Sequence, residues 1–482
     1  MVQGIDFKKS AMLLMLTLTL VGCQPVGPDF QAPEATSVAT HYRLAGQALV
    51  PQPTPLADAW WHQLHSATVD ALVAQALAHN QDIAVAQAHL RQAHALLRAA
   101  GGDMYPQLSL QANAGRARYG AEFLGPMPKP PAFNYFAIGP AISYTLDYTG
   151  ALKRSLEEQQ AQTQYAVQQL RAVSLDIAGQ TLLTLLRLAQ LHDTALLLGQ
   201  LQADAEARQQ FWMRAVAAGG ASTQQLDAVE MQTVAATQDL LRLQHEYTST
   251  LVALAPLLGI SPEAVQDPQL SLQALQLPQS MPVSLPSELL HQRPDICAAE
   301  AQLHAATAAV GVASARLYPQ IVLQANFSQE ATDPGHLWSA ASASWGLGAG
   351  LTQPIFNRTR LQQEKEAAKA VLQARWGEYR KTVVHAFTEV SVVLQHLDND
   401  QKQLSSQTLL ENISRRRVHA EEQATQQGGS TSLATLEATD QVRQVQLQGI
   451  NAQTALFSDI VRLYLALGAE PDVLHPSTTK GY

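Results

Sequence analysis

The chain repeats one pattern after about 210 residues, a period far longer than that of a solenoid repeat. Both copies hold a Tyr-Pro-Gln tripeptide followed by alternating apolar residues, at 105–113 and at 318–326. A long run without proline follows in each copy, at 141–255 and at 355–470. We therefore predict a duplicated body in which each half holds a helix, two strands and two very long helices.

Each proline-free run carries a glycine pair near its middle, Gly219-Gly220 in the first half and Gly428-Gly429 in the second. Glycine often ends a helix because it adopts the left-handed backbone without penalty. The pairs therefore predict the turns of two helical hairpins. A helix over 359–426 would be on the order of 100 Å long at 1.5 Å per residue, so it needs neighbours along its whole length.

Apolar and small side chains recur every three or four residues along both runs, which predicts coiled-coil-like packing of the long helices. Only 15% of the residues are charged, which suits helices that approach one another closely. The stripes are Val173, Ile177, Thr181, Thr184, Leu188, Leu191, Ala195 and Leu198 in the first half, and Ala368, Leu372, Trp376, Tyr379, Val383, Ala386, Val390, Leu394 and Leu397 in the second.

Four segments alternate apolar residues with small or polar ones, at 107–113, 136–146, 320–327 and 345–352. Strands with this alternation are typical of transmembrane barrels, although an ordinary half-buried hairpin shows it too. Four strands cannot close a barrel, and an open sheet edge in lipid leaves backbone groups unpaired. If the strands enter a membrane, several chains must share one barrel, and three chains would supply twelve strands.

The N-terminus has the features of an export signal. Two lysines, Lys8 and Lys9, precede a short apolar stretch, 11–21, which is followed by Gly22 and Cys23. Small residues before a cysteine resemble the bacterial lipobox, in which cleavage leaves the cysteine as a lipidated first residue. We predict N-acyl and diacylglyceryl lipid on Cys23; the alternative is an ordinary signal peptide with an incidental cysteine.

Composition argues against nucleic-acid binding, because the net charge is −9 and the pI is near 5.9. The histidines, including His62 and His65, show no recurring metal-ligand spacing, so no metal site is predicted. Gly346, Gly348 and Gly350 superficially match a nucleotide-binding loop, but the strand alternation explains them better. Cys297 is interpreted as a small packed residue. An enzyme is therefore not favoured.

Several short motifs occur in an order that resembles one family. They are Val26-Gly27-Pro28-Asp29-Phe30, Trp60-Trp61, Ala76-Leu77-Ala78-His79-Asn80, Leu285-Pro286-Ser287-Glu288-Leu289-Leu290, Arg293-Pro294-Asp295-Ile296 and Leu351-Thr352-Gln353-Pro354-Ile355-Phe356. Together they resemble the outer-membrane factor family of efflux and type I secretion systems, the TolC-like channel proteins, and in particular their lipoprotein branch.

The resemblance implies an α+β membrane protein that forms a homotrimer, with a twelve-stranded β-barrel in the outer membrane of a Gram-negative bacterium and a helical tunnel in the periplasm. It implies passive conduction, a periplasmic adaptor and an inner-membrane pump as partners, and no enzymatic chemistry or cofactor. The runner-up is a lipid-anchored periplasmic coiled-coil scaffold without a channel. The transported substrate is set mostly by the pump, so the sequence does not identify it.

The resemblance also implies a periplasmic gate on the hairpin tips. Its predicted residues are Leu433, Glu437 and Asp440 in the second half and Asp227 and Glu230 in the first. Ala434 and Asp440 depart from the family pattern, which has a further acid and an arginine there in some members. The alternative is that these acids lie on a solvated helix face. The glycine pairs Gly219-Gly220 and Gly428-Gly429 are predicted to contact the adaptor, or else to be merely structural turns.

The predicted organisation follows from these segments. It comprises a signal peptide (1–22), a lipidated strap (23–58), a first repeat (59–260, with a β-hairpin at 106–146 and a helical hairpin at 150–258), a linker (261–290), a second repeat (291–468, with hairpins at 319–352 and 358–467) and a tail (469–482).

Overall fold

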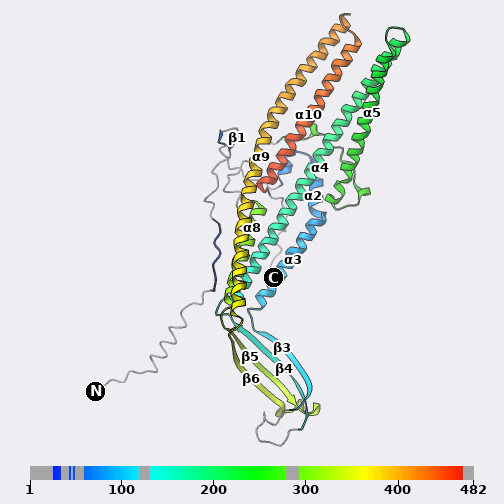
Figure 1. Cartoon of the computed structure of the whole chain (residues 1–482). Coiled ribbons are helices and arrows are strands. Elements are labelled where there is room, and N and C mark those ends of the chain that lie inside the picture. Colours follow the sequence, from blue (N-terminus) through cyan, green and yellow to red (C-terminus); the bar gives the residue numbers. More distant parts are fainter. Residues whose placement is uncertain are drawn as a thin grey trace. The chain divides into compact units, whose positions relative to one another are not determined.

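The computed structural model describes residues 25–33, 43–44, 47–48, 59–118, 131–277 and 292–469 (Figure 1). The chain divides into two compact units. Unit 1 comprises Met1–Pro33, Leu90–Tyr165 and Ala299–Tyr379, and unit 2 comprises Glu34–His89, Ala166–Ala298 and Arg380–Tyr482. Each unit draws on both halves of the sequence.

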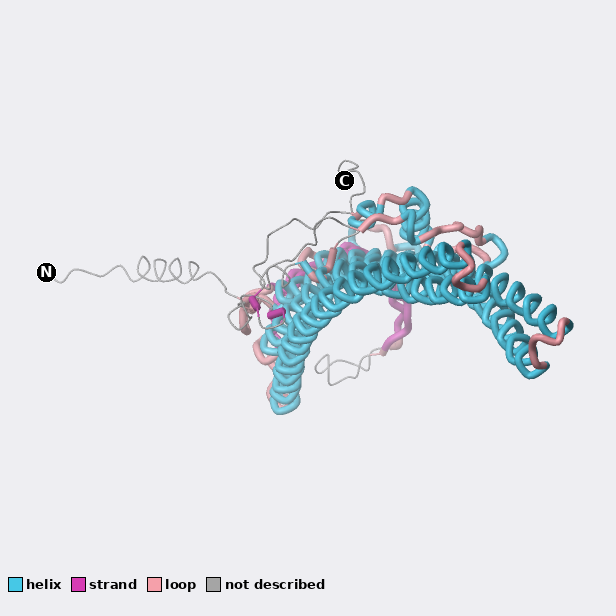
Figure 2. The backbone as a smooth tube through the Cα atoms, turned by 90° about the horizontal axis from the view of Figure 1, so that it is seen from above, coloured by secondary structure: helices cyan, strands magenta, loops and turns pink. Residues whose placement is uncertain are grey.

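Most of the described chain is helical (Figure 2). The first half contains β1 (Arg43–Leu44), β2 (Gln47–Ala48), η1 (Trp60–Leu64), α2 (Ala67–His79), α3 (Gln81–Gly102), β3 (Gln107–Ala117), β4 (Phe133–Leu146), α4 (Ala151–Ala217), α5 (Thr223–Val252), α6 (Leu254–Leu258), η3 (Pro262–Ala264) and η4 (Leu272–Ala274). The second half contains α8 (Pro294–Ala315), β5 (Gln320–Ala331), η5 (Pro334–His336), η6 (Ala340–Ser342), β6 (Ala343–Thr352), α9 (Arg358–Gln426) and α10 (Ser432–Leu467).

The four long strands of unit 1 form one antiparallel sheet in the order β3-β4-β5-β6. The register pairs Leu108 with Ile142, Ile142 with Ala325 and Ala325 with Leu347. Directly paired residues point to the same face of a sheet, so the apolar positions of all four strands share one face. The exposed members of this apolar face are Leu108, Leu110, Ile142, Leu146, Leu323, Phe327, Trp345, Leu347 and Leu351.

The opposite face of the sheet is mostly polar or small, with Tyr135 and Val322 as exceptions. It carries Ser109, Gln111, Ser143, Gln324, Asn326, Ser328, Glu330, Ser344, Gly346, Gly348 and Gly350. Trp345 and Leu347 on the apolar face are each 80% exposed, and exposed apolar patches of this kind mark sites that contact a membrane or another protein. The sheet therefore has one face suited to lipid and one suited to water.

The helix that was expected to open the first half is in fact two helices, α2 and α3, which separate at Asn80. The backbone of Asn80 is extended, and its side-chain oxygen accepts from the amides of Asp82 (2.8 Å) and Ile83 (3.3 Å). Its side-chain amide donates to the carbonyls of Pro256 and Leu257, each at 3.1 Å. Asn80 thus caps α3 and ties it to α6, which explains the break.

The two ends of the duplicated sequence meet in the core of unit 2. Trp60 stacks on Tyr464 with ring centroids 4.3 Å apart, and both side chains are almost fully buried. The Tyr464 hydroxyl donates to the side-chain oxygen of Gln63 at 3.0 Å. Stacked aromatic rings contribute about 0.5–1.5 kcal/mol to stability beyond the free energy of burying them. This stacking therefore helps to hold η1 against α10.

Arg293 occupies the start of the second half and is buried. It donates to the carbonyl of Ala466 near the end of α10 and to the carboxylates of Asp295 (2.8 Å) and Glu389 (2.9 Å). Burial alone would lower the pKa of Arg293, but the hydrogen bonds and charges of Asp295 and Glu389 raise it above its ordinary value. The Arg-Pro-Asp motif thus fastens α8, α9 and α10 at one point.

Two helices, α4 and α8, are long and apolar enough to cross a membrane by length and composition, and 61% of each such stretch is buried by packing within the chain. The expected strands overlap the observed ones, but β3 and β5 end four residues later than predicted, β4 begins three residues earlier and β6 two residues earlier.

Some predictions concern residues outside the described part of the chain. They are the signal peptide 1–22, Cys23, most of the strap 23–58, the Leu285–Leu290 motif within 278–291, and most of the tail 469–482.

Candidate functional site

The tips of the two helical hairpins have the same backbone geometry. Gly219 follows α4 and Gly428 follows α9, both with φ of +74°. The amide of Gly220 donates to Ala215 and that of Gly429 donates to Ala424, each at 2.8 Å. These bonds satisfy carbonyls that a helix end otherwise leaves free. The glycine pairs therefore form the hairpin turns that the sequence predicted.

Side-chain caps start the returning helices. Ser222 accepts from the amide of Gln225, whose side chain in turn accepts from the Ser222 amide, which makes a capping box at the start of α5. Thr431 accepts from the amide of Ala434 at the start of α10. Such caps typically contribute about 1 kcal/mol each, so both tips are well-defined turns.

The acidic residues predicted for the gate fall into two groups. Glu437 and Asp227 are exposed and have no ion-pair partner among the described residues. Glu230 and Asp440 are partly buried and have partners: Gln209 donates to Glu230 at 3.4 Å, and Arg208 pairs with Asp440. Leu433 is half-buried near the start of α10. In the described part of the chain, Glu437 therefore has no ion-pair partner, whereas Asp440 is paired with Arg208.

Two ion pairs of opposite polarity join α4 to α10 near the tips. Asp204 and Arg208 on α4 pair with Arg443 and Asp440 on α10, respectively. The two helices run in opposite directions. The residues nearer the tip, Arg208 on α4 and Asp440 on α10, therefore contact each other, and Asp204 and Arg443 do so further from the tip. The four side chains are between 15% and 22% exposed, which strengthens the pairs relative to surface pairs. We call these four residues the inter-hairpin clamp.

The sequence did not identify Asp204, Arg208 and Arg443. Burial lowers the pKa of Arg443, but an arginine remains charged at neutral pH. The sequence did contain a signal for these ion pairs. Each helix carries an acid and a base about one turn apart, which places both side chains on the same face of that helix. Pairing them required knowing that α4 and α10 are neighbours. The acid at Asp440, where some family members have an arginine, is thus matched by an arginine on α4.

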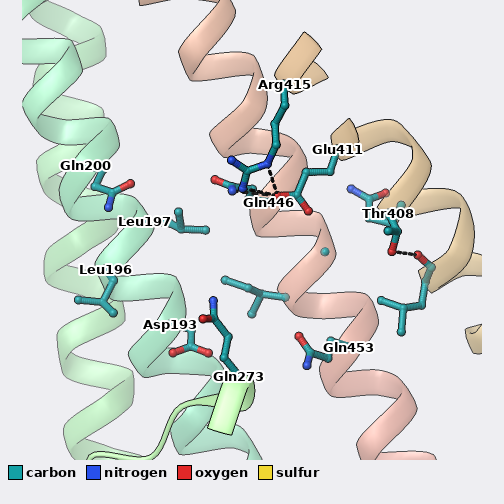
Figure 3. Close-up of a pocket in the computed structure, with 14 residues that line it drawn as sticks. Asp193, Leu196, Leu197, Gln200, Gln273, Thr408, Glu411, Arg415, Gln446 and Gln453 are labelled. Atoms are coloured by element: carbon teal, nitrogen blue, oxygen red, sulfur yellow. Dashed lines mark hydrogen bonds and ion pairs between the residues drawn. The ribbon is translucent and has the colours of Figure 1, made fainter. Parts of the chain in front are cut away.

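A polar cavity of about 380 Å³ lies between the hairpins in unit 2, further from the tips than the clamp (Figure 3). Glu411 on its wall accepts from Gln446 (3.0 Å) and Arg415 (2.7 Å). Burial would raise the pKa of Glu411, but these hydrogen bonds lower it. Asp193 accepts from Ser271 and from the amide of Leu272. The charged groups are therefore already partnered.

Across the described residues, no three His, Cys, Asp or Glu side chains gather in a way that could hold a metal ion. Cys297 is a half-buried cysteine on α8. Gly346 to Gly350 lie in strand β6, as the alternation predicted, and not in a loop before a helix.

The family model for "Outer membrane efflux protein" matches residues 72–260 and 285–469, one match in each half of the sequence. The chain belongs to the outer membrane efflux protein family. The family resemblance, the mostly helical fold with four strands, and the function as an outer-membrane efflux channel are thereby confirmed. The members of this family are transport proteins, so the chain is not an enzyme.

Individual members of the outer membrane efflux protein family agree with this assignment. The pyoverdine export outer membrane protein OpmQ of Pseudomonas aeruginosa is 30% identical over 85% of this chain and 86% of its own length. The probable outer membrane lipoprotein SilC of Salmonella typhimurium is 26% identical over 83% and 86% of the two chains. The solved outer-membrane channel OprN matches the fold with a TM-score of 0.80 at 24% identity, over 92% and 99% of the chains.

Proposed function

We propose that three copies of this efflux protein close one twelve-stranded barrel in the outer membrane, above a helical tunnel in the periplasm. The observation that carries this proposal is the four-stranded sheet with two faces and two free edges, β3 and β6. Backbone groups on a free edge have no water to bond with in lipid, and each costs several kcal/mol. Strand directions alternate, so β6 of one copy meets β3 of the next in an antiparallel pair.

The proposed channel narrows at the helix tips. Three copies of Glu437 would place three carboxylates near the axis, beside an apolar ring of Leu433. A ring of carboxylates favours cations over anions. The inter-hairpin clamp would hold α10 against α4 of the same subunit and so keep the tips drawn together. Asp227 and Glu230 contribute further acidic groups at the first tip.

The proposed partners are a periplasmic adaptor, which would contact the tips at Gly219-Gly220 and Gly428-Gly429, and an inner-membrane pump. Relatives are named for pyoverdine export, antibiotic efflux and cation efflux, which differ widely in chemistry. The same duct therefore suits several substrate classes, and we propose that the pump selects among them.

We propose that residues 1–22 are removed and that Cys23 carries the lipid. The name of SilC, a lipoprotein, supports this anchor, and Gln24 in place of an aspartate favours transfer to the outer membrane. The two structural repeats are proposed at 59–260 and 291–468, with the linker, strap and tail around them as predicted.

The test uses full-length protein extracted from bacterial membranes in mild detergent. An unboiled gel is expected to show a trimer, and the same material is expected to produce discrete conductance steps in a planar lipid bilayer. A monomer without conductance would contradict the proposal and would favour the lipid-anchored scaffold.

A further inference from the structure

The polar face of the four-stranded sheet carries one charged residue. Among the described residues of strands β3 to β6, only Arg116 and Glu330 are charged. Arg116 lies an even number of residues after Leu108 on β3, which places it on the apolar face. Glu330 lies an even number of residues after Asn326 on β5 and is therefore on the polar face. The face that would meet water in the proposed barrel thus has a single charge per subunit.

Two serine hydroxyls hold the carboxylate of Glu330. Ser328 donates to the Oε1 atom at 2.6 Å, and Ser344 of the neighbouring strand β6 donates to the same atom at 2.9 Å. Hydrogen bonds donated to a carboxylate favour its charged form. No lysine, arginine or histidine in the described part of the chain forms an ion pair with Glu330. Its negative charge is therefore fixed in position and not neutralised within the described subunit.

The strand next to Glu330 leaves its side chain open to water. Glu330 is exposed, and the residue paired with it on β4 is the small Ala137. The large residue nearby on the same face, Tyr135, leans toward β3, because a Cβ added at Gly115 would lie 2.5 Å from the Tyr135 hydroxyl. The ring of Tyr135 thus covers β3, and the carboxylate of Glu330 points into solvent.

Glu330 lies near the end of the sheet that is farthest from the helix preceding β5. The strand begins at Gln320, after α8, and ends at Ala331. Gln320 and Glu330 are ten positions apart, which is about 33 Å along a strand at about 3.3 Å per residue. With strands tilted by about 40°, this is about 25 Å along the barrel axis, the height of the apolar band of an outer-membrane barrel. Glu330 therefore lies at the outer mouth of the proposed barrel.

Three copies of Glu330 would lie at one level in a symmetric trimer. Twelve strands spaced about 4.8 Å apart and tilted by about 40° enclose a cylinder with a backbone radius of about 12 Å. Inward-pointing side chains would bring the three carboxylates to roughly 8–10 Å from the axis. An ion on the axis is then within about one Debye length of all three at about 0.1 M salt. The ring would therefore act on every ion that passes the outer mouth.

We propose that Glu330, fixed by Ser328 and Ser344, is the residue that makes the outer mouth selective for cations. This inference rests on the proposed barrel. A ring of carboxylates attracts cations and repels anions. The Glu330 ring belongs to the sheet, whereas the proposed Glu437 ring belongs to the helix tips, so each can be removed without the other. Solutes that leave the duct therefore meet a second acidic ring at the exit.

The test varies the charge at position 330 in Glu330→Cys, in full-length protein that also carries Cys297→Ser. The cysteine is modified with a methanethiosulfonate that bears either a sulfonate or a quaternary ammonium group, and reversal potentials are measured in planar bilayers under a KCl gradient. At about 0.01 M salt, the unmodified cysteine is expected to lower the cation-to-anion permeability ratio several-fold relative to Cys297→Ser alone. The sulfonate is expected to restore the ratio, and the ammonium is expected to lower it further.

Two conditions check that the effect is electrostatic. At about 1 M salt, where the Debye length is about 3 Å, the differences among the variants are expected to disappear. Glu330→Gln, which keeps the shape of the side chain and can accept from the same serines, is expected to match the unmodified cysteine.

The matched control is Gln329→Cys in the same background. Gln329 is the preceding residue of β5 and lies on the apolar face, where it pairs with Ile138 and Ala343. Both reagents are expected to leave its permeability ratio unchanged, because a charge at this position lies outside the barrel interior. The Cys297→Ser parent receives the same reagents and is expected not to respond.

The possible outcomes separate this inference from the proposed function. A parent that forms no trimer on an unboiled gel and does not conduct contradicts the proposed barrel, and the ring with it. Conducting Glu330→Cys channels whose permeability ratio is the same with either reagent and without reagent contradict only the ring. A cysteine at 330 that mass spectrometry finds unmodified by both reagents is not open to water, which overturns the ring as well. Equal responses at 329 and 330 overturn the assignment of the polar face to the interior.

Discussion

At the scale of single residues, the inter-hairpin clamp joins α4 to α10 near the tips through four charged side chains. Arg208 with Asp440 and Asp204 with Arg443 are mostly shielded from water, and removing one partner leaves the other charge partly buried. The two pairs have opposite polarity, so the clamp adds no net charge to the tips. The order of the acid and the base along each helix therefore matters for the contact between α10 and α4, and not only the presence of the charges.

The clamp predicts that Asp440→Arg increases single-channel conductance, because it places two arginines in contact. The double variant Arg208→Asp with Asp440→Arg is expected to restore the parental conductance. In a double-mutant cycle, the coupling free energy between Arg208 and Asp440 is expected to be about 1–2 kcal/mol. Equal conductance in all variants would show that the clamp does not hold the tips.

Glu437→Ala is expected to raise single-channel conductance and to weaken the preference for cations, because it removes three carboxylates from the proposed constriction. Asp239→Ala, an exposed acid on α5 that pairs within its own helix, is the control and is expected to change neither. Unchanged ion selectivity in Glu437→Ala would favour a solvated helix face for this residue.

Asp400 on α9 predicts a dependence of stability on pH. Burial, and then the nearby Asp459, raise the pKa of Asp400 above its ordinary value. An acid with a raised pKa in the folded state destabilises that state when it is charged, so its contribution worsens as pH rises through the folded pKa. Asp400→Asn is therefore expected to raise the Tm at neutral pH, with a gain that disappears at acidic pH.

The control for Asp400→Asn is Asp398→Asn, which removes a half-buried carboxylate paired with Lys402 at 2.6 Å. It is expected to leave the Tm unchanged or slightly lower at neutral pH. A Tm gain for Asp400→Asn that persists below the ordinary pKa of aspartate would contradict the electrostatic explanation.

At the scale of elements, substitutions at the hairpin tips distinguish the effect of backbone strain from the effect of a changed surface. Gly428 has a positive φ, while Gly429 does not, and a Cβ on Gly428 meets open space. Gly428→Ala is expected to cost about 1 kcal/mol through backbone strain, and Gly429→Ala less. Thermal unfolding of the two variants measures the difference, and equal costs would contradict the role of the left-handed turn.

The same tips predict a loss of function without a loss of assembly. Bulky substitutions at Gly220 and Gly429 are expected to abolish efflux in complementation assays while the proposed trimer persists on unboiled gels, because they would obstruct the proposed contact with the adaptor. Loss of the trimer in the same variants would show that the glycines are structural turns only.

Local patterns in the sequence predicted most elements but few of the contacts between them. Glycine pairs, proline-free runs and alternation are properties of neighbouring residues, so the hairpins and strands could be located. The break at Asn80 depends on carbonyls at Pro256 and Leu257, which lie far away in the sequence. The clamp partner of Asp440 is equally remote, so its role could not be predicted from the residues around it.

At the scale of the whole molecule, the sheet is the part that one subunit cannot complete. Its apolar face exposes Trp345 and Leu347, and its edges β3 and β6 are unpaired in the described chain. Lipid would satisfy the face, but only another strand can satisfy an edge. The duplication supplies two hairpins per chain, and in the proposed trimer three chains would supply a closed ring.

The central claim is that β6 of one subunit pairs with β3 of the next. Ser109→Cys on β3 is combined in turn with Gly346→Cys, Gly348→Cys or Gly350→Cys on β6, with Cys297→Ser in every variant, and the protein is oxidised in membranes. At least one pair is expected to give covalent dimers and trimers on a reducing-agent-free boiled gel, since paired strands bring Cβ atoms within disulfide range, and each single cysteine is expected to give none. Monomers alone from every pair, with the channel still conducting, would contradict the account.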